Sequence, residues 1–100
     1  MSQTLEDSVY ANLVELDFES YNLYTHTVTG LYNYFYYHLA PGSFLTAVLT
    51  GEPREVCLEY ADTWNRNTID DILRFVNEQL PPHVHGSPQA YIEWIWRKDG

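Results

Sequence analysis

The stretch that decides the fold is residues 53–82, PREVCLEYADTWNRNTIDDILRFVNEQLPP. Its apolar residues recur every three or four positions, which is the spacing of one face of a helix. This pattern predicts either one long helix or two helices that meet near residues 62–65. Pro53 suits a first helical position, and Pro81-Pro82 ends the helix because proline has no amide proton to donate. The stripe consists of Cys57, Ala61, Trp64, Thr68, Ile72, Phe75 with Val76, and Gln79 with Leu80.

Short helices are predicted on both sides of this stretch. Before it, residues 40–42 (Ala-Pro-Gly) carry a turn signal, Ser43 can cap a helix over residues 44–50, and Gly51 suits its end. After it, residues 83–86 have the composition of a loop. Ser87-Pro88 then suits the cap and first position of a last helix. The side chains of that helix expected to point inward are Tyr91, Trp94 and Ile95.

The first thirty residues carry mixed signals. Thr4-x-x-Asp7 is similar to a capping box, and the apolar spacing after it predicts a helix over residues 5–19. Residues 20–29 (SYNLYTHTVT) combine the β-branched content of a strand with apolar residues at helical spacing. Because a lone strand would have no partner, we favour helix or irregular structure there. Gly30 is placed to interrupt it.

Tyrosine is concentrated in residues 31–39, LYNYFYYHL. On a helix Leu31, Phe35 and Leu39 share one face, Tyr32 and Tyr36 flank it, and the remaining tyrosines point elsewhere. A helix that is aromatic over most of its circumference must be buried on more than one side. Two interpretations stay open: an interface, because tyrosine is common at binding hot spots, or a core whose tyrosine hydroxyls reach the surface.

These signals together predict an all-α protein. We expect a compact bundle of about five short helices in a single domain over residues 1–100, completed by dimerisation. An acidic, tyrosine-rich part covers residues 1–38, and a second helical part covers residues 39–100.

The charge is unevenly distributed. The chain has 14 Asp+Glu against 5 Lys+Arg, a net charge of −9, and residues 1–53 contain no lysine or arginine. Such a half repels phosphate, so we expect no direct binding of nucleic acid, and it attracts a basic partner. The simpler alternative is that surplus acid keeps the protein in solution. No stretch approaches the roughly 20 apolar residues of a membrane span. A single cysteine and the lack of a signal peptide favour the cytoplasm.

Residues able to carry chemistry form only weak patterns. His83-x-His85 could bind zinc together with Cys57, His38 or an acid, but no second cysteine supports this. Cys57 lies on the apolar stripe, where a free cysteine usually acts as a small buried hydrophobe. We therefore predict no enzyme, no metal and no cofactor. The four arginines could hold a small anion if they gather in space, although ion pairs with neighbouring acids are the simpler account. They are Arg54, Arg66, Arg74 and Arg97.

Residues 41–51, PGSFLTAVLTG, resemble a segment of small bacteriophage and prophage proteins, in which a PPGGFLTAVL segment follows a short helix. In that family an Ala-Asp-x-x-Asn-Arg element and a Gly-Ser-Pro helix come later, and residues 61–66 and 86–88 match them here. The resemblance covers the chain from Leu39 onward. It departs at residues 50–53, Thr-Gly-Glu-Pro, where an Asn-Asp-Leu-like segment is more usual, and residues 1–38 have no counterpart.

The resemblance implies a small accessory protein made during infection. We expect it to act by protein–protein interaction in the host cytoplasm, as an inhibitor or a DNA-charge-mimicking decoy of a host or defence protein. The expected partner is a basic or nucleic-acid-binding host protein. The alternatives are a homo-oligomer assembled through the Tyr32–Tyr37 helix and an oligomer that sequesters a small ligand. The predicted partner-binding residues are the acids and tyrosines between positions 15 and 37: Glu15, Asp17, Glu19, Tyr21, Tyr24, Tyr32, Tyr34, Tyr36 and Tyr37.

Overall fold

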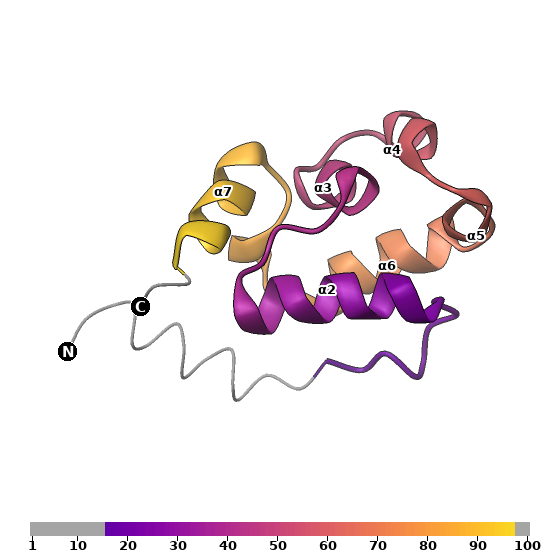
Figure 1. Cartoon of the computed structure of the whole chain (residues 1–100), viewed down its shortest axis with the longest axis horizontal. Coiled ribbons are helices and arrows are strands. Elements are labelled where there is room, and N and C mark those ends of the chain that lie inside the picture. The colour runs from indigo at the N-terminus through magenta and orange to yellow at the C-terminus, as the bar shows by residue number, and fades with distance from the viewer. Residues whose placement is uncertain (1–15, 98–100) are drawn as a thin grey trace.

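The computed structural model describes residues 16–97, and within them all regular secondary structure is helical, as predicted (Figure 1). Six α-helices and one 3-10 helix follow one another, and residues 16–97 contain no strand. The elements are α2 (Thr25–Tyr37), α3 (Ser43–Leu49), α4 (Arg54–Tyr60), α5 (Thr63–Asn67), α6 (Ile69–Gln79), η1 (Pro82–Val84) and α7 (Pro88–Trp96).

Helix α3 lies at the centre of the molecule and packs against α2, α4 and α7. It is apolar on nearly every side, which is the pattern of a helix surrounded by protein. Its first residue is Ser43 and its cap is Gly42, so the prediction of Ser43 as the cap was wrong by one position. Gly51 ends the turn after α3 with φ of 84°, as expected of a helix-terminating glycine. The buried residues of α3 are Phe44, Leu45, Ala47, Val48 and Leu49.

Helix α2 runs without a break through Gly30, contrary to the prediction. A Cβ at this position would lie 2.6 Å from Leu45 Cδ1, so the glycine allows α2 and α3 to approach closely. The helix ends before Leu39, because His38 adopts φ of 57° and the Leu39 amide bonds back to Asn33 O. Leu31 and Phe35 are therefore buried as expected, whereas Leu39 lies beyond the helix and is 46% exposed.

The stripe over residues 53–82 forms three helices rather than one or two. The first break is at Asp62, whose side chain caps α5 by accepting a hydrogen bond from the Asn65 amide at 2.8 Å. The second is at Thr68, which ends α5 and precedes α6. This change of direction leaves the Trp64 side chain 49% exposed, although the stripe predicted that it points inward.

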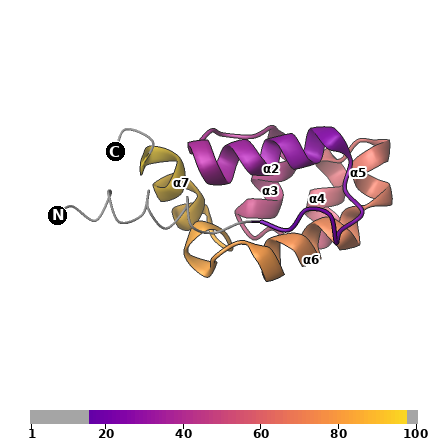
Figure 2. The same ribbon diagram turned by 90° about the horizontal axis from the view of Figure 1, so that it is seen from below.

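Residues 16–24 are irregular and run between α2 and α6 (Figure 2). The predicted helix over residues 5–19 is therefore wrong at its end, and its residues 5–15 lie outside the described part of the chain. Contacts with α6 hold the segment in place. Phe18 stacks on Phe75 with ring centroids 4.8 Å apart, and the Asp17 amide donates to Gln79 Oε1 at 3.0 Å.

The last helix closes the core at the end where α2 terminates (Figure 1). Ser87 caps α7 by accepting a hydrogen bond from the Ala90 amide, and Pro88 is its first residue, as predicted. Trp94, 1% exposed, stacks on Phe35 with ring centroids 5.7 Å apart. Its indole Nε1 donates to Tyr34 O at 2.9 Å, and His38 Nδ1 lies 2.7 Å from Trp94 O.

Candidate functional site

The predicted partner-binding residues do not form one continuous surface. Glu15 lies outside the described residues. Asp17 and Glu19 are exposed in the segment that crosses α2 and α6, and the Asp17 carboxylate accepts two hydrogen bonds from Ser20. These hydrogen bonds lower the pKa of Asp17. Tyr21 is half-buried against α6, where its hydroxyl donates to Glu78 Oε1 at 2.6 Å.

Tyr34 is part of the core. Its side chain is fully buried, and its hydroxyl donates to Val84 O at 2.5 Å. Its ring stacks on that of Tyr91 with centroids 5.5 Å apart, and burial raises its pKa. Tyr34 therefore offers no surface to a partner. It belongs to the core, but its hydroxyl is buried, whereas the interpretation of a tyrosine core expected the hydroxyls to reach the surface.

Three other tyrosines of α2 gather in what we call the tyrosine cluster: Tyr32, Tyr36 and Tyr37. The ring of Tyr32 lies 4.6 Å from that of Tyr36 and 5.9 Å from that of Tyr37, measured between centroids. Tyr32 and Tyr37 are 42% and 57% exposed, whereas the half-buried Tyr36 accepts a hydrogen bond from the Leu16 amide. The charge of the neighbouring Tyr37 phenolate and partial desolvation raise the pKa of Tyr32.

Tyr24 lies at the other end of α2 and contacts residues that sequence reasoning did not select. Its ring stacks on the exposed ring of Trp64 at 5.6 Å and on that of His26 at 6.2 Å. His26 Nε2 in turn lies 3.6 Å from Asp62 Oδ2. This aromatic group brings the start of α2 to the start of α5, two segments far apart in the sequence.

A groove lies between α2, α3, α4 and α5, and we define it by two adjoining cavities that share Pro41, Gly42, Ser43 and Tyr60. One cavity, of about 300 Å³, extends towards His26, Thr27, Asp62 and Asn65. The other, of about 560 Å³, extends towards Thr46, Thr50, Glu52 and Val56. The segments 41–51 and 61–66, which carry the resemblance, both contribute to its walls.

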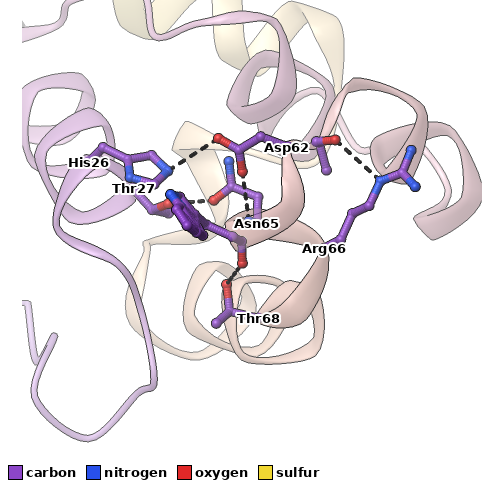
Figure 3. Close-up of polar contacts among 8 residues, drawn as sticks. His26, Thr27, Asp62, Asn65, Arg66 and Thr68 are labelled. Atoms are coloured by element: carbon purple, nitrogen blue, oxygen red, sulfur yellow. Dashed lines mark hydrogen bonds and ion pairs between the residues drawn. The ribbon is translucent and has the colours of Figure 1, made fainter.

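A buried hydrogen bond connects two walls of the groove (Figure 3). Thr27 Oγ1 on α2 donates to Asn65 Oδ1 on α5 at 2.5 Å, and both residues are buried. Asp62 lies beside this pair. Its Oδ1 accepts a hydrogen bond from the backbone N–H of Asn65, and its Oδ2 faces His26. The Asp-x-x-Asn spacing signals the cap of α5, but no local pattern shows that its asparagine meets α2.

The histidines, Cys57 and the arginines are the side chains that the sequence offered as ligands for a metal ion or an anion. No group of three or more His, Cys, Asp or Glu within residues 16–97 is arranged to hold a metal ion. Cys57 is fully buried, as predicted, and burial raises the pKa of its thiol. Arg54 pairs with Asp70 at 3.0 Å and Arg74 with Asp71 at 2.9 Å, while Arg66 Nε donates to Ala61 O. Each of these arginines is thus engaged by its own neighbours.

No protein-family model, curated protein or solved structure matches the chain. Among residues 16–97, no helix is long and apolar enough to cross a membrane.

Proposed function

We propose that the chain is a small acidic accessory protein of the bacteriophage type that acts by protein–protein contact in the cytoplasm of a host cell. Its partner is a basic or nucleic-acid-binding host protein, which it inhibits or occupies as a decoy for DNA. The observation that carries this proposal is the exposed part of the tyrosine cluster, Tyr32 and Tyr37, in a half of the chain without lysine or arginine.

Both properties serve association with a basic protein. Tyrosine offers a large, rigid contact area at little cost in side-chain entropy. The surplus negative charge raises the rate of encounter with a positive surface and loses this effect as salt increases. Neither property requires a catalytic residue, a metal or a cofactor.

The test begins with capture of partners from a bacterial lysate at low and high salt, identified by mass spectrometry. The proposal expects one enriched basic protein that high salt removes. Binding kinetics of that protein then separate the two contributions. Asp17→Lys with Glu19→Lys should slow association, whereas Tyr32→Ser with Tyr37→Ser should speed dissociation. Glu93→Lys on the exposed face of α7 is the matched charge control. Unchanged kinetics in both double variants would contradict the proposal.

Self-assembly is the second candidate function, favoured by apolar side chains exposed where α2 and α7 end: Tyr37 at 57%, Leu39 at 46% and Trp96 at 79%. Sedimentation of the unmodified protein should then show a dimer, and Tyr37→Ser with Trp96→Ser should convert it to a monomer. Phe35→Ala does not serve this test, because Phe35 is fully buried within one molecule and its loss would destabilise the fold itself. A monomer in the unmodified protein would exclude this function.

A further inference from the structure

Residues 16–24 fix the place at which the preceding part of the chain joins the described fold. Leu16 is 8% exposed and belongs to the hydrophobic core, and its amide donates to the Tyr36 hydroxyl at 3.2 Å, near the end of α2. Tyr24 immediately precedes the first residue of α2. The segment therefore runs antiparallel to α2 (Figure 2). Residues 1–15 are thus attached at the end of the molecule where α2 terminates.

That end of the molecule exposes three large apolar side chains, and we call them the apolar end: Tyr37, Leu39 and Trp96. Their exposed fractions are 57%, 46% and 79%. They come from the ends of α2 and α7, which meet here because His38 Nδ1 lies 2.7 Å from Trp94 O. Large apolar side chains that gather at one place on a surface mark a site of contact.

Side chains that can carry positive charge surround Trp94 at the same end. Arg97 Cζ lies 5.8 Å from the centroid of the Trp94 ring, and the ring centroids of His38 and His83 lie 4.3 Å and 5.6 Å from it. Helix α7 itself carries a single acid, Glu93. Residues 1–15 contain no lysine, arginine or histidine, and their acids are Glu6, Asp7 and Glu15. The charge of this segment is therefore attracted to the end at which it is attached.

The sequence of residues 5–15 has an apolar face that suits this surface. Leu5, Val9 and Leu13 recur every fourth residue, which places them on one side of a helix. Leu16 follows at the same helical spacing and already packs in the core. A helix over residues 5–15 spans about 16 Å, so it can extend from Leu16 across the apolar end without a linker.

We propose that residues 5–15 form an amphipathic helix that packs its apolar face, Leu5, Val9 and Leu13, on the apolar end of the same molecule. The packing removes apolar surface of both the segment and the described fold from water, which is the main force that holds helices together. A second copy of the chain then cannot use the same side chains. The proposal therefore excludes the second candidate function, self-assembly through the ends of α2 and α7.

Tyr37 belongs both to the apolar end and to the tyrosine cluster. The packed segment and a protein partner consequently compete for this side chain, and the segment lowers the apparent affinity of the partner. This consequence alone rests on the proposed function, because the packing itself involves no partner.

The test uses the full chain, isotopically labelled, and nuclear magnetic resonance. We expect helical Cα chemical shifts for residues 5–15. We also expect Overhauser contacts from the methyl groups of Val9 and Leu13 to ring protons of Tyr37 or Trp96. A mixed sample of labelled and unlabelled chains separates contacts within one molecule from contacts between two molecules. The contacts should lie within one molecule.

Two variants separate the faces of the proposed helix. Val9→Ser with Leu13→Ser should abolish the Overhauser contacts, shift the indole signal of Trp96 and speed the exchange of its Nε1–H with water. Ala11→Ser lies on the opposite face and is the matched control, so it should leave the contacts and the signal unchanged. The indole of Trp94 donates to Tyr34 O inside the core, and its unchanged signal shows that both variants keep the fold.

Three results would overturn the proposal: coil-like shifts for residues 5–15, contacts that arise only between two molecules, or equal effects of the double variant and Ala11→Ser. The competition has its own measurement. The double variant should bind the partner captured from the lysate more tightly than Ala11→Ser does. Equal affinity would overturn the competition, whereas the packing is decided on the chain alone, so failure of the packing and failure of the proposed function are distinguishable.

Discussion

Removal of the Tyr34 hydroxyl would show how much one buried hydrogen bond contributes to this fold. The hydroxyl donates to Val84 O at 2.5 Å, and both residues are fully buried. In Tyr34→Phe the ring keeps its stacking on Tyr91, but the carbonyl of Val84 loses its donor in a place that water does not reach.

The expected loss of stability follows from that geometry. Leaving one buried acceptor unpaired costs about 1–3 kcal/mol of the free energy of unfolding. For a domain of this size, each kcal/mol lowers Tm by about 4–8 °C. The change removes a single atom and creates little empty space, so the cavity contribution is small.

Urea unfolding followed by circular dichroism provides the measurement. The midpoint should fall while the slope with urea stays constant, since the surface exposed on unfolding is the same. Tyr60→Phe is the matched control: its side chain is 56% exposed, and its hydroxyl has no hydrogen bond within residues 16–97. That variant should lie within about 0.5 kcal/mol of the unmodified protein. Equal stability of the Tyr34 and Tyr60 variants would refute the assignment of Tyr34 to the core.

Three further outcomes are expected from the same structure. Because burial raises the pKa of Tyr34 above its ordinary value of 10.0, the unfolded chain loses that proton first. The contribution of this group should be constant well below pH 10 and fall as the pH rises through 10, with a slope that approaches about 1.4 kcal/mol per pH unit, as unfolding at pH 9–11 can show. Gly51→Ala places a Cβ 2.4 Å from Gly86 O at φ of 84°, so Tm should drop sharply. Gly42→Ala, with nothing within 4 Å, should cost less than about 1 kcal/mol. A thiol reagent should modify the buried Cys57 only in denaturant, and rapid labelling of native protein would contradict its burial.

Local chemistry made several of the helix ends predictable from the sequence. The cap at Ser87, the proline after it and the glycine at position 51 act on their immediate neighbours, so their positions are visible without the fold. Gly30 shows the opposite case. A glycine inside a helix predicts a break, but α2 continues through it, and the missing side chain makes room for Leu45 of α3. No local pattern in the sequence shows this contact.

The candidate site was less predictable, for a related reason. The spacing of residues 31–39 identifies a helix, but it does not say which tyrosines meet α7, and Tyr34 proved to be buried there. The groove depends on α4 and α5 turning at Asp62, which brings Asn65 to Thr27. Asp62 and Asn65 belong to the resembling segment 61–66, but nothing in that pattern indicates that they line the same cavity as residues of the segment 41–51.

The hydrogen bonds that close the core have a consequence for how the chain folds. Tyr34 bonds to a residue 50 positions away, and Trp94 bonds to Tyr34 across 60 positions and to His38, the residue after α2, across 56. Helical proteins usually fold fast because their contacts are local in sequence. Here the start and the end of the described chain must find each other before Trp94 is covered, which requires closure of a long loop. We therefore expect folding to be slow for an all-helical domain of this length, with α7 docking late.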